Sequence, residues 1–176
     1  MANEADIIIL KGAPASGKSQ TAKSLTQYFP KGVKVEVDTL RQMVIGVDWT
    51  NQEEHINLLK LSAGLAHDFL RLGFKPVIIV DTFSGDKITK YLETLNRFDR
   101  PLAIKIFGLF VTEEVLKKRL EFRSNGEFKD FGICKKLNDD VLKLKHKQEN
   151  QIDTSKLGPM ETAQKIYQIL GASQSA

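Results

Sequence analysis

An eight-residue stretch near the N-terminus constrains the fold more than any other part of this sequence. It reads Gly-Ala-Pro-Ala-Ser-Gly-Lys-Ser over residues 12–19 and directly follows the apolar run 7–10. This spacing binds phosphate when the loop joins a buried strand to a helix, because backbone N–H groups point inward and the helix N-terminus adds partial positive charge. We therefore expect a strand, a phosphate-binding loop and a helix, with a nucleoside triphosphate as the ligand.

The last two residues of this stretch have defined roles in phosphate-binding loops. Lys18 reaches the β- and γ-phosphates, and the hydroxyl of Ser19 ligates Mg²⁺. The alternative is an ordinary glycine-rich turn before a helix, which the position and spacing disfavour. We predict that ATP and Mg²⁺ are held by Gly12, Ala13, Pro14, Ala15, Ser16, Gly17, Lys18, Ser19 and Gln20.

The length of 176 residues fits one domain with a sizeable core. We expect a single domain over 1–171 and a disordered tail over 172–176. Hydrophobic residues make up 41% of the chain, and no apolar run reaches the roughly 20 residues of a membrane span. The single cysteine, Cys134, excludes an internal disulfide and fits a cytoplasmic protein. We expect the protein to be a monomer or a homodimer. The net charge of +4 fits an anionic substrate as well as a nucleic acid.

Short apolar runs alternate with longer amphipathic runs along the chain, a pattern that predicts an α/β fold with parallel strands. We expect strands near 6–11, 33–37, 76–81, 103–111 and 150–153. Helices are expected over 17–28, 52–72, 87–98, 112–123, 133–148 and 159–170. Ligands of open parallel sheets bind beyond the carboxyl ends of the strands. Polar residues at those ends are therefore candidates for the site.

Asp38 follows the second expected strand, and Arg41 comes three residues later. A carboxylate there can accept the proton of an attacking hydroxyl, and the arginine can bind an anionic or polar group of the acceptor. The alternative is a helix cap followed by a solvated charge. Asp81 ends the third expected strand and can hold Mg²⁺ through water or orient Ser19 and Lys18, although a turn residue also fits there. We assign all three to the substrate and metal sites.

Arg119 and Arg123 lie four residues apart and so share one face of an expected helix. The basic segment that follows has two glycines, and we predict a lid near 119–136. One arginine would neutralise charge on the transferred phosphoryl group, and the other would stack on adenine. The alternative is a solvated basic helix. Residues 153–155 can line the base pocket, although a turn of this composition needs no ligand. We expect Trp49 to pack in the core, with stacking on an acceptor ring as the alternative, and the three histidines to be surface or packing residues.

The sequence resembles small P-loop kinases of the group that includes polynucleotide kinase, gluconate kinase, adenylylsulfate kinase and chloramphenicol phosphotransferase. The residues that carry this resemblance are the phosphate loop, Asp38 with Arg41, residues 80–82, Arg119 with Arg123, and residues 152–155. The resemblance implies a three-layer P-loop NTPase sandwich, whose five-stranded parallel sheet has the order 2-3-1-4-5 with helices on both faces. It also implies that Asp38 is a general base and that Arg41 binds substrate phosphate.

The function predicted from these features is transfer of the γ-phosphoryl group of ATP to a hydroxyl of a small molecule or nucleotide. Lys18, Asp38, Arg119 and Arg123 are the predicted catalytic residues. A regulatory NTPase without a second substrate is one alternative, and a polynucleotide 5′-hydroxyl kinase is another. Nucleic acid is the less favoured substrate, because the chain lacks the second catalytic domain and the strongly basic channel of a repair enzyme. No motif over 42–75 identifies the acceptor.

Overall fold

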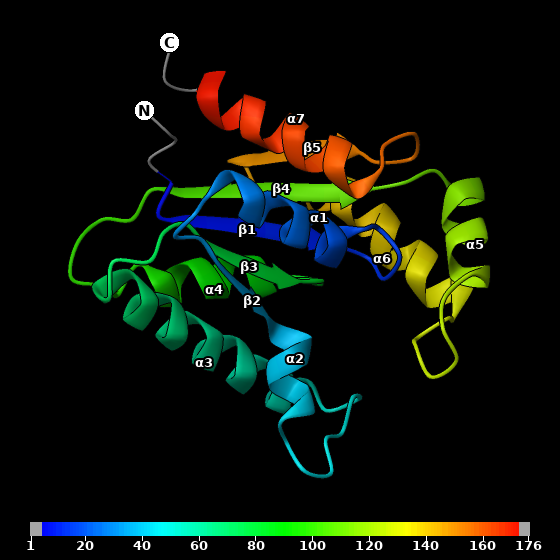
Figure 1. Cartoon of the computed structure of the whole chain (residues 1–176). Helices are drawn as coiled ribbons and strands as arrows, with labels where there is room; N and C mark the ends of the chain where they lie inside the picture. The colour runs from blue at the N-terminus through cyan, green and yellow to red at the C-terminus, as the bar shows by residue number, and fades with distance from the viewer. Residues whose placement is uncertain (1–4, 173–176) are drawn as a thin grey trace.

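A five-stranded parallel sheet forms the middle layer of the computed structural model, which describes residues 5–172 (Figure 1). Its strand order, β2-β3-β1-β4-β5, confirms the expected topology. The central strand β1 pairs with β3 and β4, so that Ile9 lies beside Ile79 and Ile106. Continuous apolar runs are typical of parallel strands that are covered on both faces. The strands are β1 Ile7–Gly12, β2 Val33–Glu36, β3 Val77–Asp81, β4 Ile104–Phe110 and β5 Glu149–Asp153.

Helices cover both faces of the sheet (Figure 1). Helices α1 and α7 pack over one face, where Leu25 and Ile166 meet Leu10. Helices α2, α3 and α4 cover the other face through a second buried cluster. The helices are α1 Lys18–Leu25, α2 Val37–Gln42, α3 Gln52–Arg71, α4 Lys87–Leu95, α5 Glu113–Glu121, α6 Phe131–Lys143 and α7 Pro159–Ala172, with the 3₁₀ helix η1 Thr26–Tyr28 after α1.

Helices α5 and α6 form a small unit at the carboxyl ends of the strands, with a core of Val111, Leu116, Leu120 and Cys134 (Figure 1). Thr112 caps α5, accepting a hydrogen bond from the Val115 amide. Asp130 caps α6 in the same way, so this helix begins at Phe131 and ends at Lys143, short of the predicted residue 148. The loop between α5 and α6 lies within the segment predicted as a lid.

The second strand ends at Glu36, one residue earlier than predicted. The chain turns there directly into α2, so Asp38 lies in the first turn of a helix. A six-residue helix is too short to show a periodic apolar pattern, which is why its extent was not predicted. Among residues 5–172, no helix is long and apolar enough to cross a membrane. Of the tail predicted over 172–176, all but Ala172 lies outside the described residues.

Candidate active site

The phosphate loop joins β1 to α1, as the sequence predicts. Its backbone is left-handed at Ala15 (φ 66°) and Gly17 (φ 92°). A Cβ atom on Gly12 would lie 2.5 Å from the Ser16 hydroxyl and 2.7 Å from the Leu109 carbonyl oxygen, so only glycine fits there. The buried Ser16 hydroxyl has no hydrogen-bond partner within the described part of the chain. A phosphate oxygen is a chemically suitable partner, so the loop fits the predicted ligand.

Lys18 is folded back over the loop, and its Nζ donates a 3.3 Å hydrogen bond to the Ala13 carbonyl. Burial lowers the pKa of Lys18, whereas the carboxylates of Asp38, Asp81 and Glu36 act in the opposite direction. Three acidic side chains from β2, α2 and β3 therefore lie within electrostatic reach of this lysine. Their negative charge favours the ammonium form that a phosphate requires.

Glu36 is a site residue that sequence analysis missed. Burial acts against ionisation of this carboxyl, yet the Ser19 hydroxyl and Lys34 hold its pKa below the ordinary value. Its Oε1 atom is buried without a hydrogen-bond partner among the described residues. A hydroxyl and a carboxylate oxygen are the hard ligands that Mg²⁺ prefers, alongside waters and substrate phosphates. The sequence signal that could have identified Glu36 is its position two residues before Asp38.

No group of three or more His, Cys, Asp or Glu side chains within residues 5–172 is arranged to hold a metal ion. Magnesium in nucleotide sites keeps several waters and takes one or two carboxylates plus phosphate oxygens. Ser19 and Glu36 fit such a metal, which would arrive with the nucleotide. Gln20, the residue after Ser19, is exposed on the first turn of α1.

Asp38 and Arg41 occupy adjacent turns of α2. The Asp38 side chain reaches solvent, but surrounding protein atoms desolvate it and, with the charge of Asp81, raise its pKa above the ordinary value. Arg41 is only 5% exposed. Its guanidinium lies 4.6 Å from the centre of the Trp49 ring, and its Nη2 donates to the Asp48 carbonyl. The expected packing role of Trp49 is therefore met only in part, because the ring remains 46% exposed.

Asp81 lies at the end of β3, where it was predicted, with both carboxylate oxygens engaged. Oδ2 accepts a hydrogen bond of 2.8 Å from the Phe83 amide, and Oδ1 lies 2.9 Å from Nε2 of His55. His55 also contacts the ammonium of Lys87. These two partners come from α3 and α4, and sequence analysis missed both. Binding of metal by Asp81 through a water molecule stays a prediction.

Arg119 clamps the phosphate loop to the segment after β5. Its guanidinium donates to the carbonyls of Ala15 (3.3 Å) and Ser16 (3.4 Å), and also to the Thr154 carbonyl at 2.7 Å. The Thr154 hydroxyl donates in turn to the Ser16 carbonyl. Arg119 therefore joins the predicted base-binding segment to the loop, while stacking of its guanidinium on adenine stays a prediction.

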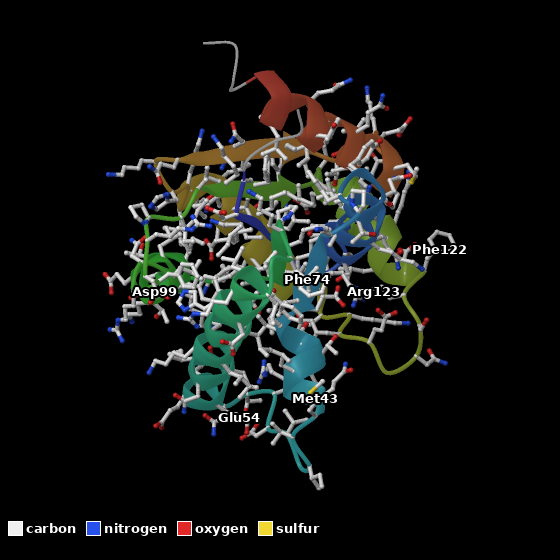
Figure 2. All side chains as sticks on the ribbon, turned by 60° about the vertical axis from the view of Figure 1, so that its left-hand side comes forward. Met43, Glu54, Phe74, Asp99, Phe122 and Arg123 are labelled. Atoms are coloured by element: carbon white, nitrogen blue, oxygen red, sulfur yellow. The ribbon has the colours of Figure 1, made fainter. Side chains whose placement is uncertain are left out.

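Arg123 lies two residues beyond the end of α5, on the side facing the strand ends, whereas the neighbouring Phe122 points outward (Figure 2). Its Nη2 pairs with Glu127 at 2.9 Å, and Glu127 also accepts a hydrogen bond from the Ser124 amide. The positive charge of Arg123 contributes to lowering the pKa of Lys18, so the two cations lie within electrostatic reach. Arg123 thus brings a positive charge into the neighbourhood of Lys18, while its action on the phosphates and the lid itself stay predictions.

The sequence over residues 7–133 matches the family model of an AAA domain. That match covers well over half of the chain. This protein belongs to the AAA domain family. No curated protein matches the sequence of this AAA-domain protein.

Solved structures show the same fold. The tunicamycin resistance protein of Deinococcus radiodurans is 22% identical with a TM-score of 0.72, covering 95% of this chain and 96% of its own. A gluconokinase from Sinorhizobium meliloti is 16% identical with a TM-score of 0.69, and the match covers 99% of this chain and 96% of the gluconokinase. Shikimate kinase from Bacteroides thetaiotaomicron is 15% identical with a TM-score of 0.65, and the match covers 94% of this chain and 98% of the shikimate kinase. The predicted resemblance to small P-loop kinases is confirmed at the level of fold.

Proposed function

We propose that this AAA-domain protein transfers the γ-phosphoryl group of ATP to a hydroxyl of a small molecule or nucleotide. The observation that carries the proposal is the placement of Asp38 on α2, within electrostatic reach of Lys18 in the phosphate loop and of Arg41 on the same helix. An NTPase that acts only as a switch needs no base for an acceptor hydroxyl. The raised pKa of Asp38 supports a role as base, because it strengthens the carboxylate as a proton acceptor.

The reaction follows from the positions of these side chains. The loop backbone and Lys18 hold the β- and γ-phosphates of ATP. As the acceptor oxygen attacks the γ-phosphorus, its proton passes to Asp38, the bond to the β-phosphate oxygen breaks, and ADP leaves. Arg123 neutralises charge on the transferred group. The Ser19 hydroxyl and Glu36 would hold a bound Mg²⁺, with Asp81 contributing through a water molecule, and the ion would neutralise phosphate charge.

The acceptor is expected to carry an anionic or polar group beside its hydroxyl. Arg41 is buried and forms no ion pair among residues 5–172, and its Nε atom has no hydrogen-bond partner there. Buried cations in proteins are normally paired, so a ligand anion is the natural partner. The adjoining loop exposes Met43, Ile45 and Trp49, which offers apolar surface to the rest of the acceptor.

A screen for ADP release stimulated by hydroxyl compounds tests the proposal. The panel includes gluconate, shikimate, tunicamycin, chloramphenicol, nucleosides and a 5′-hydroxyl oligonucleotide, with water as the background acceptor. We expect at least one compound to raise ADP release in the wild-type protein but not in Asp38→Asn. Release that no compound stimulates would favour the regulatory NTPase. Stimulation by the oligonucleotide alone, lost steeply with added salt, would favour the polynucleotide kinase.

A further inference from the structure

A chain of three buried polar residues lies beneath the acceptor side of the site. The Nζ atom of Lys87 lies 3.1 Å from Nδ1 of His55, and Nε2 of His55 lies 2.9 Å from Oδ1 of Asp81. All three are nearly buried, with exposures of 9%, 7% and 4%. They belong to α4, α3 and β3, so the chain ties two helices of the acceptor side to the end of a central strand.

The chemistry of Lys87 fixes the direction of both hydrogen bonds. An ammonium only donates, so Nδ1 of His55 must accept, and the ring proton then sits on Nε2 and points at Asp81. His55 is thus a neutral bridge between a cation and an anion. Because the Phe83 amide holds the second oxygen of Asp81, the carboxylate has no freedom to rotate.

Burying these charged groups would cost stability if they served only to hold the fold together. Lys87 is the first residue of α4, where the helix dipole disfavours a cation, and burial lowers its pKa. Its remaining protons are donated to Gln52 Oε1 at 2.8 Å and Ser84 Oγ at 3.2 Å. Apolar side chains of similar volume often replace buried ionic groups without loss of stability. Local conflicts of this kind in folded proteins are expected at functional sites.

We propose that His55 and Lys87 are positioning residues for phosphoryl transfer, which hold the Asp81 carboxylate in place beside Asp38 and Lys18. The inference rests on the proposed function. Asp81 acts on both neighbours, because its charge helps to raise the pKa of Asp38 and opposes the lowering of the pKa of Lys18. Without His55, the carboxylate would be free to pair with Lys18 or Arg41 and withdraw that cation from the substrates.

Lys87→Met tests the proposal, since it keeps the length of the side chain and removes its charge. Lys90→Met is the matched control, because Lys90 lies on the same helix in an exposed pair with Asp86. With the best acceptor of the panel, we expect kcat of Lys87→Met to fall about 10- to 100-fold, as for other supporting residues of active sites. KM for ATP should stay near wild type, and Lys87→Arg should keep most of the wild-type rate. Because Lys87→Met leaves the buried Asp81 without this cation, each rate is expressed per folded protein.

His55→Gln is the second variant, with His67→Gln as its control on the same helix. Nε2 of His67 donates to the Leu95 carbonyl, and the His67 ring packs against Phe98. The glutamine amide can still donate to Asp81, so we expect a smaller loss of kcat than in Lys87→Met. A rate in Lys87→Met equal to the Lys90→Met control, or a loss of rate that only follows the fraction unfolded, would overturn the proposal.

The ¹⁵N signals of the His55 ring test the same chain of contacts without any acceptor. A proton on Nε2 that exchanges faster in Lys87→Met supports the inference, and a proton on Nδ1 in the wild type contradicts it. If the wild-type protein transfers phosphate to no compound, the proposed function fails, whereas this measurement still decides whether Lys87 and His55 hold Asp81.

Discussion

Replacing Glu149 with glutamine should destabilise the protein strongly, because it breaks a buried ion pair. The ammonium of Lys11 lies 2.9 Å from Glu149 Oε2, and the two side chains are 4% and 0% exposed. The pair joins β1 to β5 across β4, where Gly108 stands beside Lys11 and has no side chain to block the contact. Lys11 directly precedes the phosphate loop, so the pair also anchors the strand that carries the site.

The loss of stability expected for Glu149→Gln follows from the burial of its ion pair with Lys11. Removing one partner of a buried pair leaves an uncompensated charge and costs about 3–5 kcal/mol. A domain of this size has a total stability of roughly 5–15 kcal/mol, and each kcal/mol shifts the melting temperature by about 2–4 °C. Glu149→Gln should therefore lower the melting temperature by roughly 6–20 °C. The double variant Lys11→Met with Glu149→Met should recover most of that loss, because no buried charge remains.

Urea unfolding of the wild type, Lys11→Met, Glu149→Met and the double variant gives the coupling energy directly. The exposed pair of Lys118 with Glu114 is the control, and Glu114→Gln should cost far less stability than Glu149→Gln. A cost below about 1 kcal/mol for Glu149→Gln would refute the reasoning, since it would mean that Lys11 finds water or another partner.

Three further predictions concern the packing of strands and the phosphate loop. A Cβ on Gly108 would overlap the Glu149 carboxylate and lie 3.0 Å from Val141, so Gly108→Ala should lower the unfolding free energy by about 1–3 kcal/mol in urea titrations. Gly64→Ala, in open space on α3, should instead raise it by about 0.5–1 kcal/mol. Arg100 holds the pKa of Asp6 below its ordinary value. Asp6→Asn should thus cost about 1–2 kcal/mol at pH 7, and the difference from wild type should vanish as the pH falls through that lowered pKa. Arg119→Lys should weaken ATP binding about tenfold by calorimetry, because a single ammonium cannot reach both loop segments that the guanidinium clamps.

The strands and most helices were predictable because their signals are local, whereas the strand order was implied by the resemblance to small P-loop kinases. Parallel strands buried on both faces read as unbroken apolar runs, as in residues 7–10 and 77–80. The 20-residue helix α3 carries a long amphipathic pattern and an Asn51 cap. The six residues of α2 are too few for any such pattern, so the sequence left Asp38 at a strand end rather than in a helix.

The same distinction, between signals that are local in the sequence and contacts that only the fold creates, holds for the site. The members of the phosphate loop are neighbours in the sequence, and so are Asp38 and Arg41, so local spacing indicates each motif. His55 lies 26 positions from Asp81 and 32 from Lys87, and only the packing of α3 and α4 on the sheet joins them. A lysine in the first turn of a helix was the one local sign of an unusual role for Lys87.

The measurement that tests the central claim most directly compares Asp38→Asn with the wild type in two assays. Binding of ATP with Mg²⁺ is measured by calorimetry, and transfer to the best acceptor is measured in a single turnover. Loss of a general base should lower the transfer rate about 10²- to 10⁴-fold. ATP affinity should change less than about threefold, because the loop and Lys18 remain intact. Transfer at a near wild-type rate in Asp38→Asn would contradict the assignment of Asp38 as the base.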